Sequence, residues 1–342
     1  MTPTMPNRYP RRSVALMVAV ILLMAIPVLA QQGGGSQTGA GEPAASLSEP
    51  VRETAAEDGT TLPWWAWSLI LFVFCFAMGI LAVMAGVGGG VLYVPLVAGF
   101  FPFHIDFVRA TGLLIALSGA LAAGPGLLKA RLASLRLALP CALFASLGGV
   151  AGALIGLRMD PSVLQIALGV CVLAVVLLML VARNVEIPEV LRSDRLSAGL
   201  NIGGAYFEES QNRSIPWRIH RTPLGLVMFI GVGFVAGMFG LGAGWASVPV
   251  LNLVMGVPLK LAVGSSVFMI SINGAAAAWI YLNGGCWMPV MAVPSILGLM
   301  LGTSLGVKLL GRSRPRSIRY VIILVMVFAG VRSLLRGLGV WP

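Results

Sequence analysis

Long apolar stretches recur along this chain, and they restrict its possible folds more than any other feature. Residues 163–181, for example, contain Gln165 as their only strongly polar side chain. Stretches of about 20 such residues match the roughly 30 Å hydrocarbon core of a bilayer. Only 10% of the 342 residues are charged, against roughly 25% in soluble domains. The sequence therefore predicts an all-α polytopic membrane protein embedded in a lipid bilayer.

The net charge of +11 is compatible with nucleic-acid binding or with membrane anchoring. The basic residues stand in short loops between the apolar stretches, as cytoplasmic anchors do in membrane proteins. No basic stretch carries the interleaved aromatic residues of a nucleic-acid-binding segment. We therefore expect no nucleic-acid partner.

The residue types that carry metal, redox or catalytic chemistry are scarce. None of the four cysteines forms a CxxC pair or stands near a histidine at metal-ligand spacing, so we expect small apolar filler and no cofactor. The two histidines stand in loops, and no HExxH pattern, GxSG pattern or pair of intramembrane aspartates occurs, which argues against an intramembrane enzyme. These residues are Cys75, Cys141, Cys171, Cys286, His104 and His220.

The first 62 residues have the pattern of an export signal followed by a linker. Residues 1–30 combine a positively charged start, an apolar run and small residues before position 31, as in a signal peptide or signal anchor. Residues 31–62 are rich in Gly, Ser, Ala and acidic side chains, which is typical of a flexible linker. We expect this linker to be exported.

Two sets of five apolar stretches flank a polar segment, which suggests an internal duplication. A shift of 154 positions, without a gap, pairs Gly86 with Gly240, Gly88 with Gly242, Gly90 with Gly244, Pro95 with Pro249, Pro140 with Pro294 and Thr111 with Ser265. We interpret residues 63–182 and 223–342 as two transmembrane repeats. Residues 183–222 are then a connector between them, for which we expect one short helix.

The charges of the loops orient the two repeats. Residues 129–136, 183–222 and 308–319 carry an excess of Lys and Arg, which stay on the cytoplasmic side. This assignment reverses every crossing of the second repeat relative to the first and predicts inverted-topology repeats, a frequent transporter architecture. Arg332 and Arg336 then lie near an exported C-terminus, where we expect them to snorkel to the interface.

Each repeat is predicted to hold a helical hairpin broken at glycines, followed by three transmembrane helices. The second arms of the hairpins, 87–101 and 244–257, are short, and are re-entrant or oblique. Two helix starts that meet near the midplane would offer free N–H groups and positive dipole ends to an anion. Alternatively, the glycines are close-packing contacts between helices. The candidate residues are Gly86, Gly88, Gly89, Gly90 and Pro95, with Gly240, Gly242, Gly244 and Pro249.

The helices that follow the hairpins supply further candidate substrate ligands, Thr111, Ser118, Ser265, Ser266 and Asn273. Alternatively, the hydroxyls bond carbonyls of their own helices, and the amide of Asn273 joins two helices.

Charged residues stand at the edges of the apolar stretches. His104, Asp106 and Arg109 fall in a predicted loop at 102–109, where we expect solvation. A proton-coupling role for Asp106 or His104 is the alternative, because ionisable groups at membrane depth are commonly functional.

The ordered motifs of both halves resemble those of the sulfite exporter TauE/SafE family. They are Gly86-Val-Gly-Gly-Gly with Val94-Pro95, Ala110-Thr111-Gly112-Leu113, Leu128-Lys-Ala-Arg-Leu132, Gly240-Leu-Gly-Ala-Gly with Val248-Pro249, Val263-Gly264-Ser265-Ser266 and Ile272-Asn273-Gly274. The resemblance covers about residues 70–335 and implies transport of sulfite, a sulfonate or a related organic anion.

The resulting hypothesis is a secondary transporter that moves a small anion across the inner membrane, bound near the midplane between two Gly-rich hairpins. A carboxylate without sulfur is the alternative substrate, and a non-transporting membrane scaffold is the alternative class. The sequence leaves a homo-oligomer open.

Overall fold

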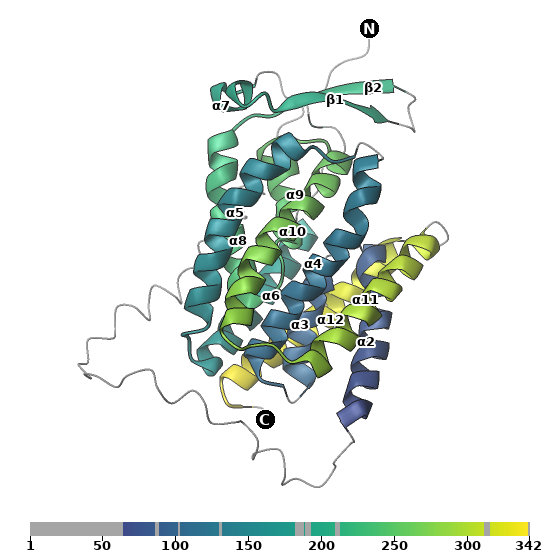
Figure 1. The fold of residues 1–342 in the computed structure, drawn as a ribbon, viewed down its shortest axis with the longest axis vertical. Coiled ribbons are helices and arrows are strands. Elements are labelled where there is room, and N and C mark those ends of the chain that lie inside the picture. The colour runs from purple at the N-terminus through teal and green to yellow at the C-terminus, as the bar shows by residue number, and fades with distance from the viewer. Residues whose placement is uncertain are drawn as a thin grey trace, which may run out of the picture.

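The computed structural model of the protein describes residues 64–85, 89–101, 103–129, 132–181, 188, 193–208, 213–310 and 315–340. Its long helices run side by side in one bundle, and a short helix and a two-stranded hairpin lie together at one end (Figure 1). The predicted export signal and linker, residues 1–62, lie outside the described residues.

The described helices of the first half are α2 (Trp64–Ala85), α3 (Gly89–Phe100), α4 (Ile105–Lys129), α5 (Leu135–Gly156) and α6 (Pro161–Val181). The connector holds α7 (Arg195–Gly199), β1 (Gly203–Glu208) and β2 (Arg213–Arg218). The second half contains α8 (Thr222–Phe239), α9 (Gly244–Pro249), the π-helical turn η1 (Val250–Val254), α10 (Leu259–Asn283), α11 (Pro289–Leu310) and α12 (Pro315–Gly337).

Six helices of the described part of the chain are long and apolar enough to span a membrane, namely α2, α4, α5, α6, α8 and α10. Many of their large apolar side chains are exposed, as expected where lipid rather than water surrounds them. The prediction of an all-α polytopic membrane protein is therefore confirmed, apart from the small hairpin of the connector.

The helix positions follow the spacing of the sequence repeat. The helices α10, α11 and α12 begin 154 positions after α4, α5 and α6, respectively. The halves also interlock, because α2 packs along α11 while its counterpart α8 packs along α5. This spacing supports the predicted duplication. The opposite membrane orientations of the two halves stay a prediction.

Both hairpins have the short second arms that the sequence predicts. The helix α3 has 12 residues, and the apolar helical segment Gly244–Val254 follows the second break. The first arm α8 ends because Gly240 adopts a left-handed φ of 71°, and Gly242 repeats that value. Glycine adopts such a φ without steric cost, whereas other residues are strained there. These two glycines thus produce the break between α8 and α9.

The two arginines near the C-terminus contact α3, and their snorkelling to the interface stays a prediction. The Arg332 guanidinium lies 4.2 Å from the centroid of the Phe100 ring, and Arg336 Nη1 donates a 2.7 Å hydrogen bond to the Ala98 carbonyl. The last carbonyls of a helix have no partner within it, and Arg336 satisfies one of them at the end of α3. These side chains therefore have partners within the protein, which explains positive charge at an end predicted to be exported.

The connector contains the predicted short helix, α7, and an antiparallel hairpin that the sequence analysis missed. Gly203 of β1 lies opposite Arg218 of β2. The missed strands have six residues each and show no clear alternation of apolar and polar side chains, so they carry little of the period-two signal.

Asp194 attaches the connector to the start of α8. Its carboxylate accepts hydrogen bonds from the backbone N–H and the hydroxyl of Thr222, at 3.1 and 2.8 Å. Burial raises the pKa of the Asp194 carboxyl, but the hydrogen bonds from Ser197 and Thr222 together outweigh burial, so its pKa lies below its ordinary value. The charged form is thus the one that stabilises this attachment.

We expect Asp194→Ala to reduce stability by about 0.5–2 kcal/mol, the usual effect of removing a helix cap. Because the folded-state pKa is lowered, the attachment is fully present above the unfolded pKa and is lost as pH falls through the folded value. Thermal unfolding in detergent at pH 7 and below pH 4 measures both effects, with the variant and parent converging at the acidic pH. An equal difference at both pH values would contradict this role of the carboxylate.

Candidate functional site

A cavity of about 190 Å³ lies where the two short arms begin. The starts of α3 and α9 and the break before α9 form part of its wall, and α2, α4, α10 and α11 form the rest. The lining residues are Ala82, Gly89, Ile115, Ala116, Gly119, Ala120, Leu241, Gly242, Gly244, Val267, Ile270, Leu299 and Thr303. The cavity therefore combines the two hairpins that the repeat pattern singled out.

Three of the predicted glycines line this cavity, namely Gly89, Gly242 and Gly244. A Cβ atom added at Gly242 would lie 3.0 Å from Ala116 Cβ, and one at Gly244 would lie 3.0 Å from Ile270 Cδ1. The first hydrogen bonds of α9 are donated by Ala246 and Ser247 to the Ala243 carbonyl. The N–H groups of Gly244 and Trp245 thus precede the hydrogen-bonded part of the helix, as at any helix start.

Other predicted glycines and prolines occupy packing positions. A Cβ atom added at Gly90 would lie 2.9 Å from the carbonyl oxygens of Gly112 and Leu241, and one at Gly240 would overlap the backbone of Arg109. Pro95 and Pro249 are buried within α3 and α9, outside the cavity wall. Gly86 and Gly88 lie outside the described residues.

The predicted hydroxyl ligands also lie away from the cavity wall. Ser118 donates a 2.6 Å hydrogen bond to the Leu114 carbonyl, and Ser266 donates a 2.8 Å bond to the Val263 carbonyl, within their own helices. Ser265 Oγ accepts a 3.1 Å hydrogen bond from the Ser134 backbone N–H and so ties α10 to the start of α5. Thr111 is buried in α4.

Asn273 is fully buried, and neither polar atom of its amide has a hydrogen-bond partner among the described residues. Its Oδ1 lies against Gly149 of α5, where a Cβ atom would overlap it. The 154-residue shift relates Asn273 to Gly119 and Gly149 to Thr303, and these two counterparts line the cavity. In the second half the Asn273 side chain therefore fills the position that corresponds, by the repeat, to the cavity beside Gly119 in the first half.

Thr303 of α11 carries a hydroxyl in the cavity wall that the sequence analysis did not identify. The repeat register pairs it with a glycine rather than with another hydroxyl, so it did not stand out as a matched polar position. The remaining lining side chains are apolar or absent.

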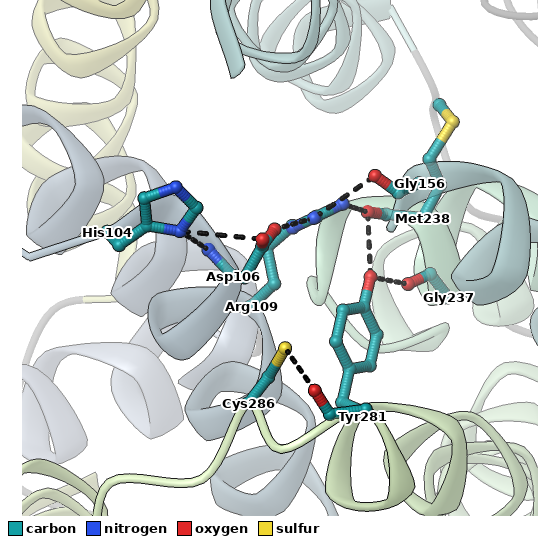
Figure 2. A network of polar contacts seen from close by, with 9 residues as sticks. His104, Asp106, Arg109, Gly156, Gly237, Met238, Tyr281 and Cys286 are labelled. Atoms are coloured by element: carbon teal, nitrogen blue, oxygen red, sulfur yellow. Dashed lines mark hydrogen bonds and ion pairs between the residues drawn. The ribbon is translucent and has the colours of Figure 1, made fainter. Parts of the chain in front are cut away.

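Arg109 differs most from its prediction. It lies in α4 rather than in a solvated loop, and its side chain is fully buried. Figure 2 shows its guanidinium reaching toward the backbone of Gly156 and Met238, with Asp106 and Tyr281 beside it. His104 remains exposed and pairs with Asp106, with His104 Nδ1 3.4 Å from Asp106 Oδ2. The loop prediction failed because α4 begins at Ile105, before the apolar stretch itself.

Residues 71–333 match the family model described as "Sulfite exporter TauE/SafE". The chain belongs to the sulfite exporter TauE/SafE family. The match includes α3, the whole second hairpin and the whole cavity wall, so these TauE/SafE features lie in the region shared with the family.

A similar curated protein is the "Probable membrane transporter protein YunE" of Bacillus subtilis (strain 168), at 24% identity over 119 residues. The matched region is 35% of this chain and 44% of that relative, so the chain spans less than half of the relative's length in the comparison. No solved structure matches this TauE/SafE chain. Family membership and the apolar helices together make the protein a multi-pass membrane protein.

Proposed function

We propose that this protein is a secondary transporter for a small anion, either sulfite or a related sulfonate, and that the anion binds in the cavity between the starts of α3 and α9. The observation that carries this proposal is the meeting of two short helix starts, one from each half, at one cavity. Helix starts present free N–H groups and the positive end of the helix dipole. These features favour the binding of an anion although the helix start itself carries no formal charge.

The chemistry of the cavity wall supports the same proposal. Among the residues that the structure describes, the wall contains no carboxylate side chain, so no fixed negative charge there repels an anion. Thr303 can donate a hydrogen bond, and the apolar side chains leave room for the organic part of a sulfonate. The volume exceeds the roughly 30 Å³ share of one liquid water several-fold, which suits a small anion.

The apolar wall also suits a short carboxylate, so the substrate test includes both classes. Purified protein in liposomes is assayed for flux of sulfite, sulfate, thiosulfate, short sulfonates and short carboxylates. We expect saturable flux of sulfite or a sulfonate. Flux of carboxylates alone would select the alternative substrate, and the absence of flux for every anion would contradict anion transport.

Thr303→Val should weaken anion binding because it keeps the shape of the side chain and removes its hydroxyl. A hydrogen bond to a charged group contributes about 1.5–3 kcal/mol, which corresponds to roughly tenfold to hundredfold in affinity. Thermal-shift titration with the transported anion measures the change. The neighbouring Ser304→Ala is the matched control, because the Ser304 hydroxyl is exposed and bonds the Met300 carbonyl. Equal affinities for Thr303→Val and the parent would argue against Thr303 as a ligand.

A further inference from the structure

Arg109 is the one fully buried charged side chain in the part of the chain that the structure describes. Removing a guanidinium from water is costly unless ion pairs and hydrogen bonds replace its hydration. Charged residues within membrane proteins are accordingly rare and commonly functional. The contacts of Arg109 therefore indicate what its burial achieves.

The guanidinium joins the ends of two helices. Arg109 Nη1 donates a 2.8 Å hydrogen bond to the Met238 carbonyl of α8, and Nη2 donates a 3.2 Å bond to the Gly156 carbonyl of α5. Nη2 also pairs with Asp106, which offsets the positive charge. These carbonyls belong to the last turns of their helices, where donors from the same helix are missing.

Tyr281 of α10 strengthens the same end of α8. Its ring centroid lies 5.3 Å from Arg109 Cζ, and its hydroxyl donates to the carbonyls of Gly237 and Met238 at 2.9 and 3.1 Å. The Met238 carbonyl thus receives a donor from α4 and another from α10. Figure 2 shows these two side chains converging on it.

This end of α8 leads directly into the cavity wall. Only Phe239 and Gly240 separate Met238 from the lining residues Leu241 and Gly242. Gly240 also lies against the Arg109 backbone, so the break rests on the same turn of α4 that carries the guanidinium. Fixing the last carbonyls of α8 therefore fixes the direction in which the break enters the cavity.

We propose that Arg109 and Tyr281 are positioning residues of the transport site, which hold the α8–α9 break in the shape that lines the cavity. This inference rests on the proposed function, since it treats that cavity as the substrate site. The 154-residue shift pairs Arg109 with Val263 and Tyr281 with Leu127, neither of which can donate a hydrogen bond from its side chain. Arg109 and Tyr281 therefore support the second hairpin, and the repeat-related positions supply no equivalent donor for the first.

The test combines a structural and a kinetic measurement on Tyr281→Phe, which keeps the ring and removes the hydroxyl. For the first, Gly119→Cys is introduced into a Cys286→Ala parent, because no described neighbour lies within 4 Å of a Cβ atom at Gly119 and the other three cysteines are buried. The labelling rate by a small water-soluble thiol reagent then reports access to the cavity. For the second, sulfite KM and kcat are measured in liposomes without the Gly119→Cys change.

We expect Tyr281→Phe to assemble normally, to change the labelling rate at least about threefold, and to raise the sulfite KM about fivefold with kcat within twofold. Arg109→Lys should change both quantities in the same direction, because a lysine keeps the charge and loses the planar fork. The control is Ser333→Ala, which removes a 2.9 Å hydrogen bond to the Gln165 carbonyl between α12 and α6 and should change neither.

Unchanged labelling and KM in Tyr281→Phe would overturn the positioning role. Poor assembly of Tyr281→Phe, or equal effects of Ser333→Ala, would also overturn it in favour of general stabilisation. A parent without sulfite flux would contradict the proposed substrate alone, because the labelling comparison does not require transport. If Gly119→Cys in the Cys286→Ala parent is never labelled, the proposed site is contradicted. The sulfite KM would then be the one test of the positioning role of Tyr281 and Arg109.

Discussion

Gly119→Leu is expected to abolish anion flux in a protein that still reaches the membrane and folds. Among the described residues, and apart from its own helix backbone, a Cβ atom at Gly119 has no heavy atom within 4 Å, and the residue lines the cavity of about 190 Å³. The added isobutyl group therefore enters empty space rather than a packed contact, and it takes the room that the substrate needs. We expect flux to fall at least about hundredfold, equivalent to about 2.7 kcal/mol.

Ala122→Leu is the matched control, because Ala122 lies three residues further along α4 and is exposed. Ala122 is not among the lining residues, so the same added bulk there should leave flux within about twofold. Size-exclusion chromatography in detergent measures folded yield, and liposome assays measure flux. Normal flux in a well-folded Gly119→Leu protein would show that the substrate does not pass through this cavity.

The sequence was sufficient for the large-scale features because they depend on composition and spacing. Apolar stretches long enough for a bilayer predicted the helices, and the gapless shift predicted which helices correspond in the two halves. The break between α8 and α9 was predictable because only glycine adopts left-handed φ values freely, and Gly240 and Gly242 both adopt 71°. Three of the nine predicted hairpin residues, Gly89, Gly242 and Gly244, line the cavity.

The polar candidates were less predictable, because a sequence does not say which face of a fully apolar helix meets a cavity. Ser118 and Ser266 donate hydrogen bonds to carbonyls of their own helices, as the alternative interpretation expected. Thr303 lines the cavity but was not predicted as a candidate ligand. Helices surrounded by lipid and protein show little amphipathic periodicity, so the usual pattern for orienting a face is missing. Only the packing of α4, α10 and α11 shows which side chains of these helices line the cavity.

Arg109 and Asn273 illustrate a second limit. In a sequence, a charged residue beside an apolar stretch looks like a loop residue. Only the contacts with α5 and α8 show that Arg109 donates hydrogen bonds to the last carbonyls of these two helices. Asn273 was singled out from sequence because a buried amide is costly, and it is indeed buried without partners in the described residues. Its role as a substrate ligand stays a prediction, since it packs against Gly149 rather than facing the cavity.

The close contact between α5 and α8 predicts the second large effect of a mutation. It concerns a glycine that, unlike Gly119, has no space for a side chain. A Cβ atom at Gly233 of α8 would overlap the backbone carbonyl of Ala145 in α5, and additions at Gly148 and Gly152 would overlap the backbone of α8 in return. A backbone carbonyl within a helix cannot rotate away, so the two helices would have to separate along their length. Overpacking of a core costs about 1–3 kcal/mol, and contact between two backbones leaves the least room for relaxation.

Gly233→Ala should therefore lower the yield of folded protein at least about tenfold, as measured by size-exclusion chromatography of detergent-solubilised membranes. Gly124→Ala is the control, because its new methyl group would lie 3.6 Å from the Phe268 ring, which is an ordinary contact. Substrate affinity in the small folded fraction of Gly233→Ala should stay close to that of the parent, since Gly233 does not line the cavity. A full yield of stable Gly233→Ala protein would refute the close packing of α5 and α8. Weaker substrate binding by such protein would instead assign this glycine to the site.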